Sequence, residues 1–125
     1  MMQKENSPAV VLFGHGSRDP LWRKPIEAVA ERMRIQAPDT PVACAYLELT
    51  TPALPDVVAQ LKAEGVVAVR ILPMFLGVGR HAREDLPALV QTLRQEHPEI
   101  TFDLQPSIGE HPAMLELMAQ IGAGR

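Results

Sequence analysis

Four short apolar runs alternate with four amphipathic segments, and this alternation constrains the fold more than any other feature of the chain. The runs at residues 9–13, 42–49, 66–74 and 100–104 have the length and continuous apolar character of strands buried within a sheet. In the segments that follow them, apolar residues recur at helical spacing. Strands that alternate with helices in this way predict a parallel sheet with helices on both faces.

Three of the helical segments carry start signals. Thr51 followed by Pro52 is expected to cap the second helix, because threonine suits the cap and proline the first helical position. Asp85 is expected to cap the third helix, over about residues 85–96, and His111 to open the fourth. The predicted apolar faces are Ile26, Val29, Ala30 and Met33; Leu54, Val57, Val58 and Leu61; Leu86, Leu89, Val90 and Leu93, expected to face inward; and Met114, Leu117, Met118 and Ile121.

The order of the strands follows from the handedness of their connections. Right-handed crossovers leave few topologies, and the order 2-1-3-4 of flavodoxin-like sheets is expected. The fold class is therefore a three-layer α/β/α domain with a four-stranded parallel sheet, one domain over residues 1–125 with an ordered core at about 8–121. In such sheets ligands bind beyond the carboxyl ends of the strands, where the order reverses. That point lies between the first and third strands.

Composition narrows the class of protein. The 125 residues suit one core, which must be aliphatic because 46% of the residues are hydrophobic and only 4% aromatic. The net charge of −3 argues against a general nucleic-acid binder. No apolar run approaches the roughly 20 residues that span a bilayer. Cys44, the lone cysteine, cannot form an intrachain disulfide and suits a reducing compartment. We expect a cytoplasmic protein without a membrane or nucleic-acid partner.

Each loop at the expected switch point contains one histidine. Residues 14–19 (GHGSRD) include His15, and residues 77–85 (GVGRHARED) include His81. Because neighbouring strands lie about 4.8 Å apart, imidazoles at these two strand ends can converge on one ion. Glu48, near the end of the second strand, can reach the same crevice. Two neutral imidazoles and a carboxylate suit cobalt, nickel, zinc or ferrous iron. Because the set contains no thiolate, such a site could bind the ion and release it again.

Other interpretations of these residues stay open. A histidine by itself is more often a capping or surface residue, and His97 and His111 both have helix-end positions. His111 also follows the fourth strand and could line the same face as the site. The loop at 14–17 could bind an anion through its backbone N–H groups, although it lacks the spacing and lysine of a P-loop. Ser17 is not in the elbow motif of a hydrolase.

Three motifs in this order resemble those of a known family. They are GHGSRD at 14–19, YLEL followed by Thr-Thr-Pro at 46–52, and P-x-F-L-x-x-G-x-H-x-x-x-D-x-P at 73–87. The chain is similar in these motifs to the CbiX family, the short sirohydrochlorin cobaltochelatases of the anaerobic cobalamin pathway. The resemblance extends from about residue 8 to 121. Related chelatases insert iron or nickel instead of cobalt.

The resemblance implies a lyase that inserts a divalent metal, cobalt or alternatively iron or nickel, into a sirohydrochlorin-type tetrapyrrole. His15 and His81 would hold the metal with Glu48 nearby, and one of the three would accept a pyrrole proton as general base. The metal is a substrate, and no organic cofactor is implied. Larger members enclose the site between two such domains, so a homodimer is expected to supply the second wall here.

Cations near both loops are expected to pair with the carboxylates of such a tetrapyrrole. The alternative is that they are helix-surface cations beside Asp19, Glu27 and Glu84. The predicted substrate-binding residues are Ser17, Arg18, Arg80 and Arg83, and the same cationic cluster includes Arg23 and Lys24.

Two rival functions use the same residues differently. A non-catalytic carrier of metal or tetrapyrrole would use both histidines but would need no proton acceptor. A phosphate-binding module would use the Gly14 loop and be indifferent to His81→Ala. Asp85 matches the Asp-x-Pro of the family motif, yet the helix-cap role is favoured for it.

Overall fold

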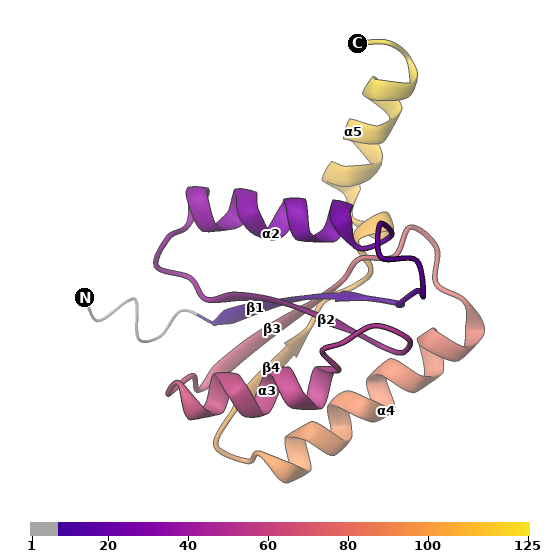
Figure 1. Ribbon diagram of the computed structural model, residues 1–125. Coiled ribbons are helices and arrows are strands. Elements are labelled where there is room, and N and C mark those ends of the chain that lie inside the picture. Colours follow the sequence, from indigo (N-terminus) through magenta and orange to yellow (C-terminus); the bar gives the residue numbers. More distant parts are fainter. Residues whose placement is uncertain (1–7) are drawn as a thin grey trace.

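The computed structural model describes residues 8–125, except for the side chain of His81. Its parallel sheet has the predicted order, β2-β1-β3-β4. The strands are β1 (Ala9–Gly14), β2 (Val42–Tyr46), β3 (Ala68–Pro73) and β4 (Thr101–Leu104). The helices are α2 (Lys24–Gln36), α3 (Leu54–Ala63), α4 (Arg80–Glu96) and α5 (Pro112–Gly122), with the 3-10 turn η1 (Ile108–Glu110) before α5. Figure 1 shows α2 on one face of the sheet and α3 and α4 on the other.

The central strand β1 supplies both cores, because successive strand residues point to opposite faces. All of its residues are buried. Val11 and Phe13 belong to the core beneath α3 and α4, while Val10 and Leu12 pack on the α2 side. The predicted apolar face of α3 is confirmed, since Leu54, Val57, Val58 and Leu61 are all buried. The observed strand order also confirms the predicted switch point between β1 and β3, the two central strands.

Helix α3 begins later than predicted. Ala53 is its N-cap and Pro55 lies in its first turn, so the predicted cap at Thr51 and Pro52 is wrong. The peptide between Thr51 and Pro52 is cis, and the Pro52 carbonyl accepts a hydrogen bond from the Tyr46 N–H at 3.0 Å. Both prolines suit a helix start by local rules. Pro52 instead lies beside the edge of β2, where its carbonyl pairs with Tyr46.

Helix α4 begins earlier than predicted. Gly79 is its N-cap, so the expectation that Asp85 caps this helix is wrong. Ala82 and Leu86 lie one helical turn apart, are 6% and 5% exposed, and pack into the core. Their burial extends the helix ahead of the Asp-x-Pro signal, and Pro87 lies inside the helix. Tertiary packing therefore overrides the local start signal.

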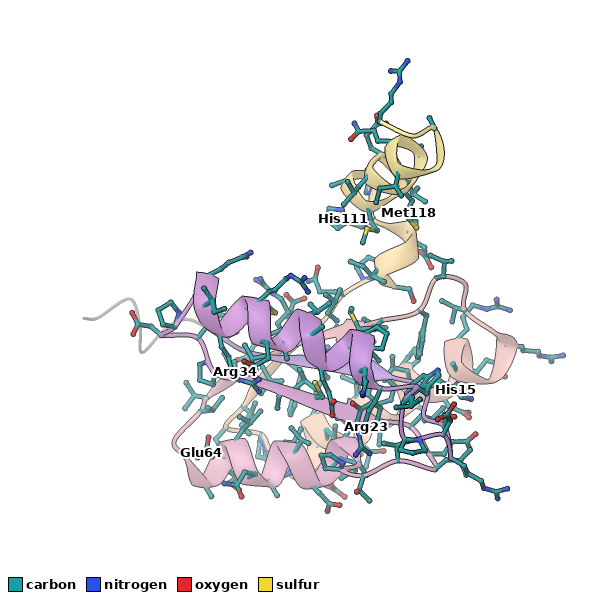
Figure 2. The ribbon with its side chains drawn as sticks, turned by 45° about the horizontal axis from the view of Figure 1, so that its top comes forward. His15, Arg23, Arg34, Glu64, His111 and Met118 are labelled. Atoms are coloured by element: carbon teal, nitrogen blue, oxygen red, sulfur yellow. The ribbon has the colours of Figure 1, made fainter. Side chains whose placement is uncertain are left out.

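Helix α5 projects from the layered body and packs mainly on η1 (Figure 1). His111 caps it, with its Nδ1 accepting a hydrogen bond from the Ala113 N–H at 3.2 Å, and it lies apart from His15 (Figure 2). No residue of this helix is buried, and Leu117 and Ile121 are 48% and 66% exposed. Met114 and Met118 of the predicted apolar face are half-buried, so this face is only partly covered within residues 8–125. Over the same residues, no helix has the length and apolarity of a membrane span.

Tyr46 buries a phenol at the end of β2. The residue is 2% exposed, and its ring packs edge-on against Trp22 with centroids 5.9 Å apart. Within the described part of the chain, its hydroxyl has no hydrogen-bond partner. Burial is the main cause that raises the pKa of Tyr46 to about 12, from an ordinary value of 10.0. The neutral phenol therefore contributes stability below pH 10 that is lost as the pH rises towards 12.

Replacing Tyr46 with phenylalanine should remove this alkaline sensitivity. Between pH 10 and 12 we expect the wild type to lose up to about 2 kcal/mol of unfolding free energy relative to the variant, measured by urea denaturation. At neutral pH the two proteins should agree within about 1 kcal/mol, because the hydroxyl makes no hydrogen bond. A parallel loss of stability in both proteins above pH 10 would contradict this account.

Candidate metal-binding site

The loops after β1 and β2 are joined by bonds that continue the sheet ladder. The Leu47 N–H donates to the Gly14 carbonyl at 3.0 Å, and the Glu48 N–H donates to the His15 carbonyl at 3.1 Å. These bonds place the two side chains of interest together, with His15 Nε2 3.4 Å from Glu48 Oε2. The imidazole and the carboxylate are 51% and 56% exposed, so both remain accessible to a ligand.

Two backbone positions shape this contact. Gly16 has φ of 109°, and a Cβ there would lie 1.7 Å from the Glu48 carbonyl oxygen. Leu49 has φ of 64°, a left-handed conformation that costs a non-glycine residue about 1–2 kcal/mol. This turn directs the chain away after Glu48, which is why β2 ends at Tyr46 and not at residue 49 as predicted.

A hollow of about 460 Å³ lies beyond the ends of β1 and β3, at the predicted switch point. Phe75, which follows β3, packs edge-to-face against His15 at 6.4 Å and against Phe13 at 6.1 Å between ring centroids. The imidazole therefore contacts an aromatic ring from one neighbouring loop and a carboxylate from the other. The hollow is lined by His15, Met74, Phe75, Leu76, Gly77, Gly79, Arg80 and Ala82.

His81 is the second residue of α4, between Arg80 and Ala82, which both line the hollow. Its side chain lies outside the described residues, so only its backbone position is known. Among the side chains that the structure does describe, no group of three or more His, Cys, Asp or Glu residues could hold a metal ion. His15 and Glu48 are in contact, and the roles of His15 and His81 as metal ligands stay predictions.

The predicted substrate-binding residues of α4 have local partners. Arg80 pairs with Glu84 at 3.3 Å on the same helix, and its side chain is 80% exposed. Arg83 donates a hydrogen bond to the Val78 carbonyl at 3.3 Å. An exposed pair of this kind is worth little, so Arg80 can exchange its carboxylate partner at small cost. Among the cations, Arg80 is the one that lines the hollow with His15.

The cations after β1 are not brought to the hollow. Arg18 and Lys24 are exposed, and neither forms an ion pair within the described residues. Arg23 pairs with Glu27 at 3.2 Å and lines a separate groove beside Tyr46. The Ser17 hydroxyl accepts a hydrogen bond from the Asp19 N–H at 3.1 Å and so stabilises the turn of its own loop. For Arg23 and Arg80 the structure thus shows the helix-surface pairing that the sequence left as an alternative.

A larger groove of about 690 Å³ runs along the edge strand β2, between α2 and α3. It is lined by apolar residues together with Arg34, Thr40, Asp56, Gln60 and Glu64, and by no histidine whose side chain the structure describes. Arg34 already pairs with Glu31 at 2.8 Å and donates to the Val42 carbonyl. The larger groove therefore offers weaker candidates for metal binding than the smaller hollow, which is lined by His15.

Sequence reasoning missed two residues of the site. Phe75 was part of a quoted motif, and its position directly after β3 could have suggested a contact with the loop after β1. Thr50 gave no such signal, because its role depends on a residue 33 positions away. Its hydroxyl accepts a hydrogen bond from the Ser17 N–H at 2.9 Å and donates one to the Ser17 carbonyl at 2.7 Å.

Comparisons with known proteins place this fold among chelatases. A family model described as CbiX matches residues 9–121. A sirohydrochlorin cobaltochelatase from Methanothermobacter thermautotrophicus is 36% identical over 81 residues, which are 65% of this chain and 56% of that protein. The chain spans 57% of a second one, from Methanopyrus kandleri, at 34% identity over 82 residues that are 66% of this chain. It thus covers little more than half the length of these relatives.

Solved structures share the architecture. A CbiX protein from Marinobacter aquaeolei VT8, described as a cobalamin (vitamin B12) biosynthesis protein, superposes with a TM-score of 0.82 and 32% identity, covering 94% of this chain and 96% of that one. The sirohydrochlorin chelatase SirB from Bacillus subtilis subspecies spizizenii, in complex with cobalt, superposes with a TM-score of 0.75. At 21% identity, with 94% of this chain and 50% of SirB covered, the second likeness shows the fold alone.

Proposed function

Because this chain belongs to the CbiX family, we propose that it is a chelatase that inserts a divalent metal ion into sirohydrochlorin. The observation that carries the proposal is the accessible pair of His15 and Glu48, 3.4 Å apart at the hollow between β1 and β3. Cobalt is the proposed metal substrate, supported by the names of the archaeal relatives. Iron and nickel are the alternatives, because imidazole and carboxylate ligands accept all three.

Metal insertion requires that two pyrrole protons leave as the ion enters the ring. In the proposed mechanism neutral His15 binds the ion, and His81 is the second ligand on the same side of the macrocycle. The Glu48 carboxylate orients the imidazole and is placed to accept a proton as general base. Because Glu48 is more than half exposed, a proton taken there can pass on to solvent.

The substrate is a polycarboxylate, so its side chains need cationic partners. Arg80 and Arg83 at the start of α4, with Arg18 and Ser17 after β1, are the proposed contacts. The exposed pair between Arg80 and Glu84 supports this role, because a weak surface pair exchanges readily for a substrate carboxylate. No organic cofactor is part of the proposal, and a reducing cytoplasm is the proposed location.

We further propose that a second copy of this chain supplies the other wall of the cleft. One sheet with its loops presents a hollow that is open on one side, whereas a planar macrocycle needs contact on both faces. Helix α5 projects from the layered body (Figure 1), and its apolar face supports self-association because none of its large apolar side chains is buried within residues 8–125. Leu115, Leu117 and Ile121 are exposed, Leu115 by 50%, and Met114 and Met118 are half-buried.

Charges placed on the apolar face of α5 should dissociate the proposed dimer. Leu117→Glu combined with Ile121→Glu is expected to convert a dimer into a monomer in sedimentation velocity at low micromolar concentration, because burying two carboxylates in an apolar interface is costly. Gln120→Glu, on the polar side of the same helix, adds charge without touching that face and should leave the dimer intact. A wild type that is monomeric while fully active would contradict this part of the proposal.

The decisive test of the function is the rate of cobalt(II) insertion into sirohydrochlorin, followed by absorbance in the presence and absence of protein. We expect an acceleration that saturates with both substrates. If the protein binds cobalt and sirohydrochlorin but leaves the insertion rate at its uncatalysed value with cobalt, nickel and iron alike, the chelatase proposal fails. A carrier would then be the better assignment.

A further inference from the structure

We propose that Thr50 is a positioning residue that holds His15 and Glu48 in contact through a double hydrogen bond across the two loops. The inference rests on the proposed function, in which these two residues handle the metal substrate. Thr50 follows Glu48 by two residues and Ser17 follows His15 by two, so the Thr50–Ser17 bonds lie directly beside the site.

The two side-chain hydrogen bonds of Thr50 take the place of the next backbone hydrogen bond between the loops, which the structure does not form. Backbone bonds connect the two loops as far as His15 and Glu48, with the Glu48 N–H donating to the His15 carbonyl. The left-handed turn at Leu49 then removes the backbone of the second loop from pairing position. The hydroxyl of Thr50 takes over, accepting from the Ser17 N–H and donating to the Ser17 carbonyl. A hydroxyl can do both with one atom.

The contact between His15 and Glu48 needs such support. Both side chains are about half exposed, and a polar contact in that setting contributes little to holding its own geometry. On one side of the His15–Glu48 contact, towards the strands, Gly16 lies against the Glu48 carbonyl and fixes how closely the two loops approach. On the far side Thr50 is partly buried and prevents the loops from separating. Residues that orient metal ligands in this way typically change metal affinity by about 10- to 100-fold when replaced.

The hydroxyl can be removed without changing the size of the side chain. Thr50→Val keeps the shape and loses both hydrogen bonds, whereas Thr50→Ser retains the hydroxyl. Thr51→Val is a matched control, because it makes the same change at the next residue, which is exposed and forms no hydrogen bond within the described chain. Thermal denaturation of each variant establishes that it is folded before any ligand is added.

Cobalt(II) affinity, measured by calorimetry, is the first readout. We expect Thr50→Val to bind about 10-fold or more weakly, with altered cobalt d–d absorption bands, while Thr50→Ser and Thr51→Val stay within about 3-fold of the wild type. Wild-type affinity and an unchanged cobalt spectrum in folded Thr50→Val would overturn the inference. Equal losses in the serine and valine variants would also overturn it, because the hydroxyl would then not be responsible.

A metal-free readout separates this inference from the proposed function. The side-chain ¹⁵N resonances of His15, recorded for every variant in the same buffer, respond to the nearby carboxylate, and Glu48→Gln shows the direction in which its loss moves them. We expect Thr50→Val to move them in that direction and to expose the Ser17 amide to faster hydrogen exchange, with Thr50→Ser unchanged. Unchanged resonances and exchange in Thr50→Val would overturn the inference even if the wild type binds cobalt. If the wild type does not bind cobalt, the proposed function fails instead. The role of Thr50 is then decided by the His15 resonances alone.

Discussion

His15→Ala is expected to lower the rate of cobalt insertion by about 10²- to 10⁴-fold and to weaken cobalt binding strongly. The imidazole is the one described histidine at the hollow, and its contacts with Phe75 and Glu48 hold it at the ends of β1 and β2. Glu48→Gln should lose less, about 10- to 100-fold, because it keeps the shape of the side chain and removes only the charge and the proton acceptor.

The matched control for His15 is another histidine of the same chain. His97 is the C-cap of α4, at the opposite end of that helix from Arg80, so His97→Ala should keep the wild-type insertion rate. The assay measures saturation kinetics for the wild type and the three variants, each shown to be folded by circular dichroism. Folded His15→Ala with wild-type kinetics would remove His15 from the mechanism, and an equal loss in His97→Ala would point to damage unrelated to the site.

Gly16→Ala is expected to produce the largest change in stability of any single substitution in the site. An alanine Cβ would lie 1.7 Å from the Glu48 carbonyl oxygen, a backbone atom that cannot rotate away. The φ of 109° at Gly16 is also strained for any residue with a side chain. Together these effects should lower the unfolding free energy by roughly 3 kcal/mol or more, or force the two loops apart.

Urea denaturation measures this loss, and a second glycine calibrates it. Gly77→Ala makes the same change in the loop after β3, where a Cβ would meet no atom within 4 Å and φ is not left-handed. That variant should stay within about 0.5 kcal/mol of the wild type. If Gly16→Ala survives by moving the loops, its cobalt affinity should fall although it remains folded. A stable Gly16→Ala protein with wild-type cobalt affinity would mean that the close approach of these loops is not required.

Several features of the fold were predictable from local patterns. The apolar runs identified all four strands, and right-handed crossovers together with the order of flavodoxin-like sheets predicted their arrangement as β2-β1-β3-β4, which is confirmed. The switch point followed from that order, and His15 was singled out because it follows the first strand between two glycines. These inferences need only short-range periodicity and general topology, which explains why they were confirmed for the strands and the sheet.

Element boundaries were less predictable where packing competes with local signals. Asp85 and Thr51 both have good cap chemistry, yet α4 begins after Gly79 and α3 after Ala53. In α4 the burial of Ala82 adds helix ahead of the cap signal. The apolar face of α5 was correctly identified by its spacing, but spacing does not tell whether such a face is covered within one chain.

By itself, the sequence determined the order of strands and helices, the sheet topology and the two loops at the switch point, because these follow from apolar periodicity and general rules of topology. The tertiary structure decided which side chains meet there. His15 and Glu48 are 33 residues apart, as are Ser17 and Thr50, and their contacts arise only after β1 and β2 have paired. A hydrogen bond between such distant residues leaves no periodic trace in the sequence, whereas a buried strand or an amphipathic helix does.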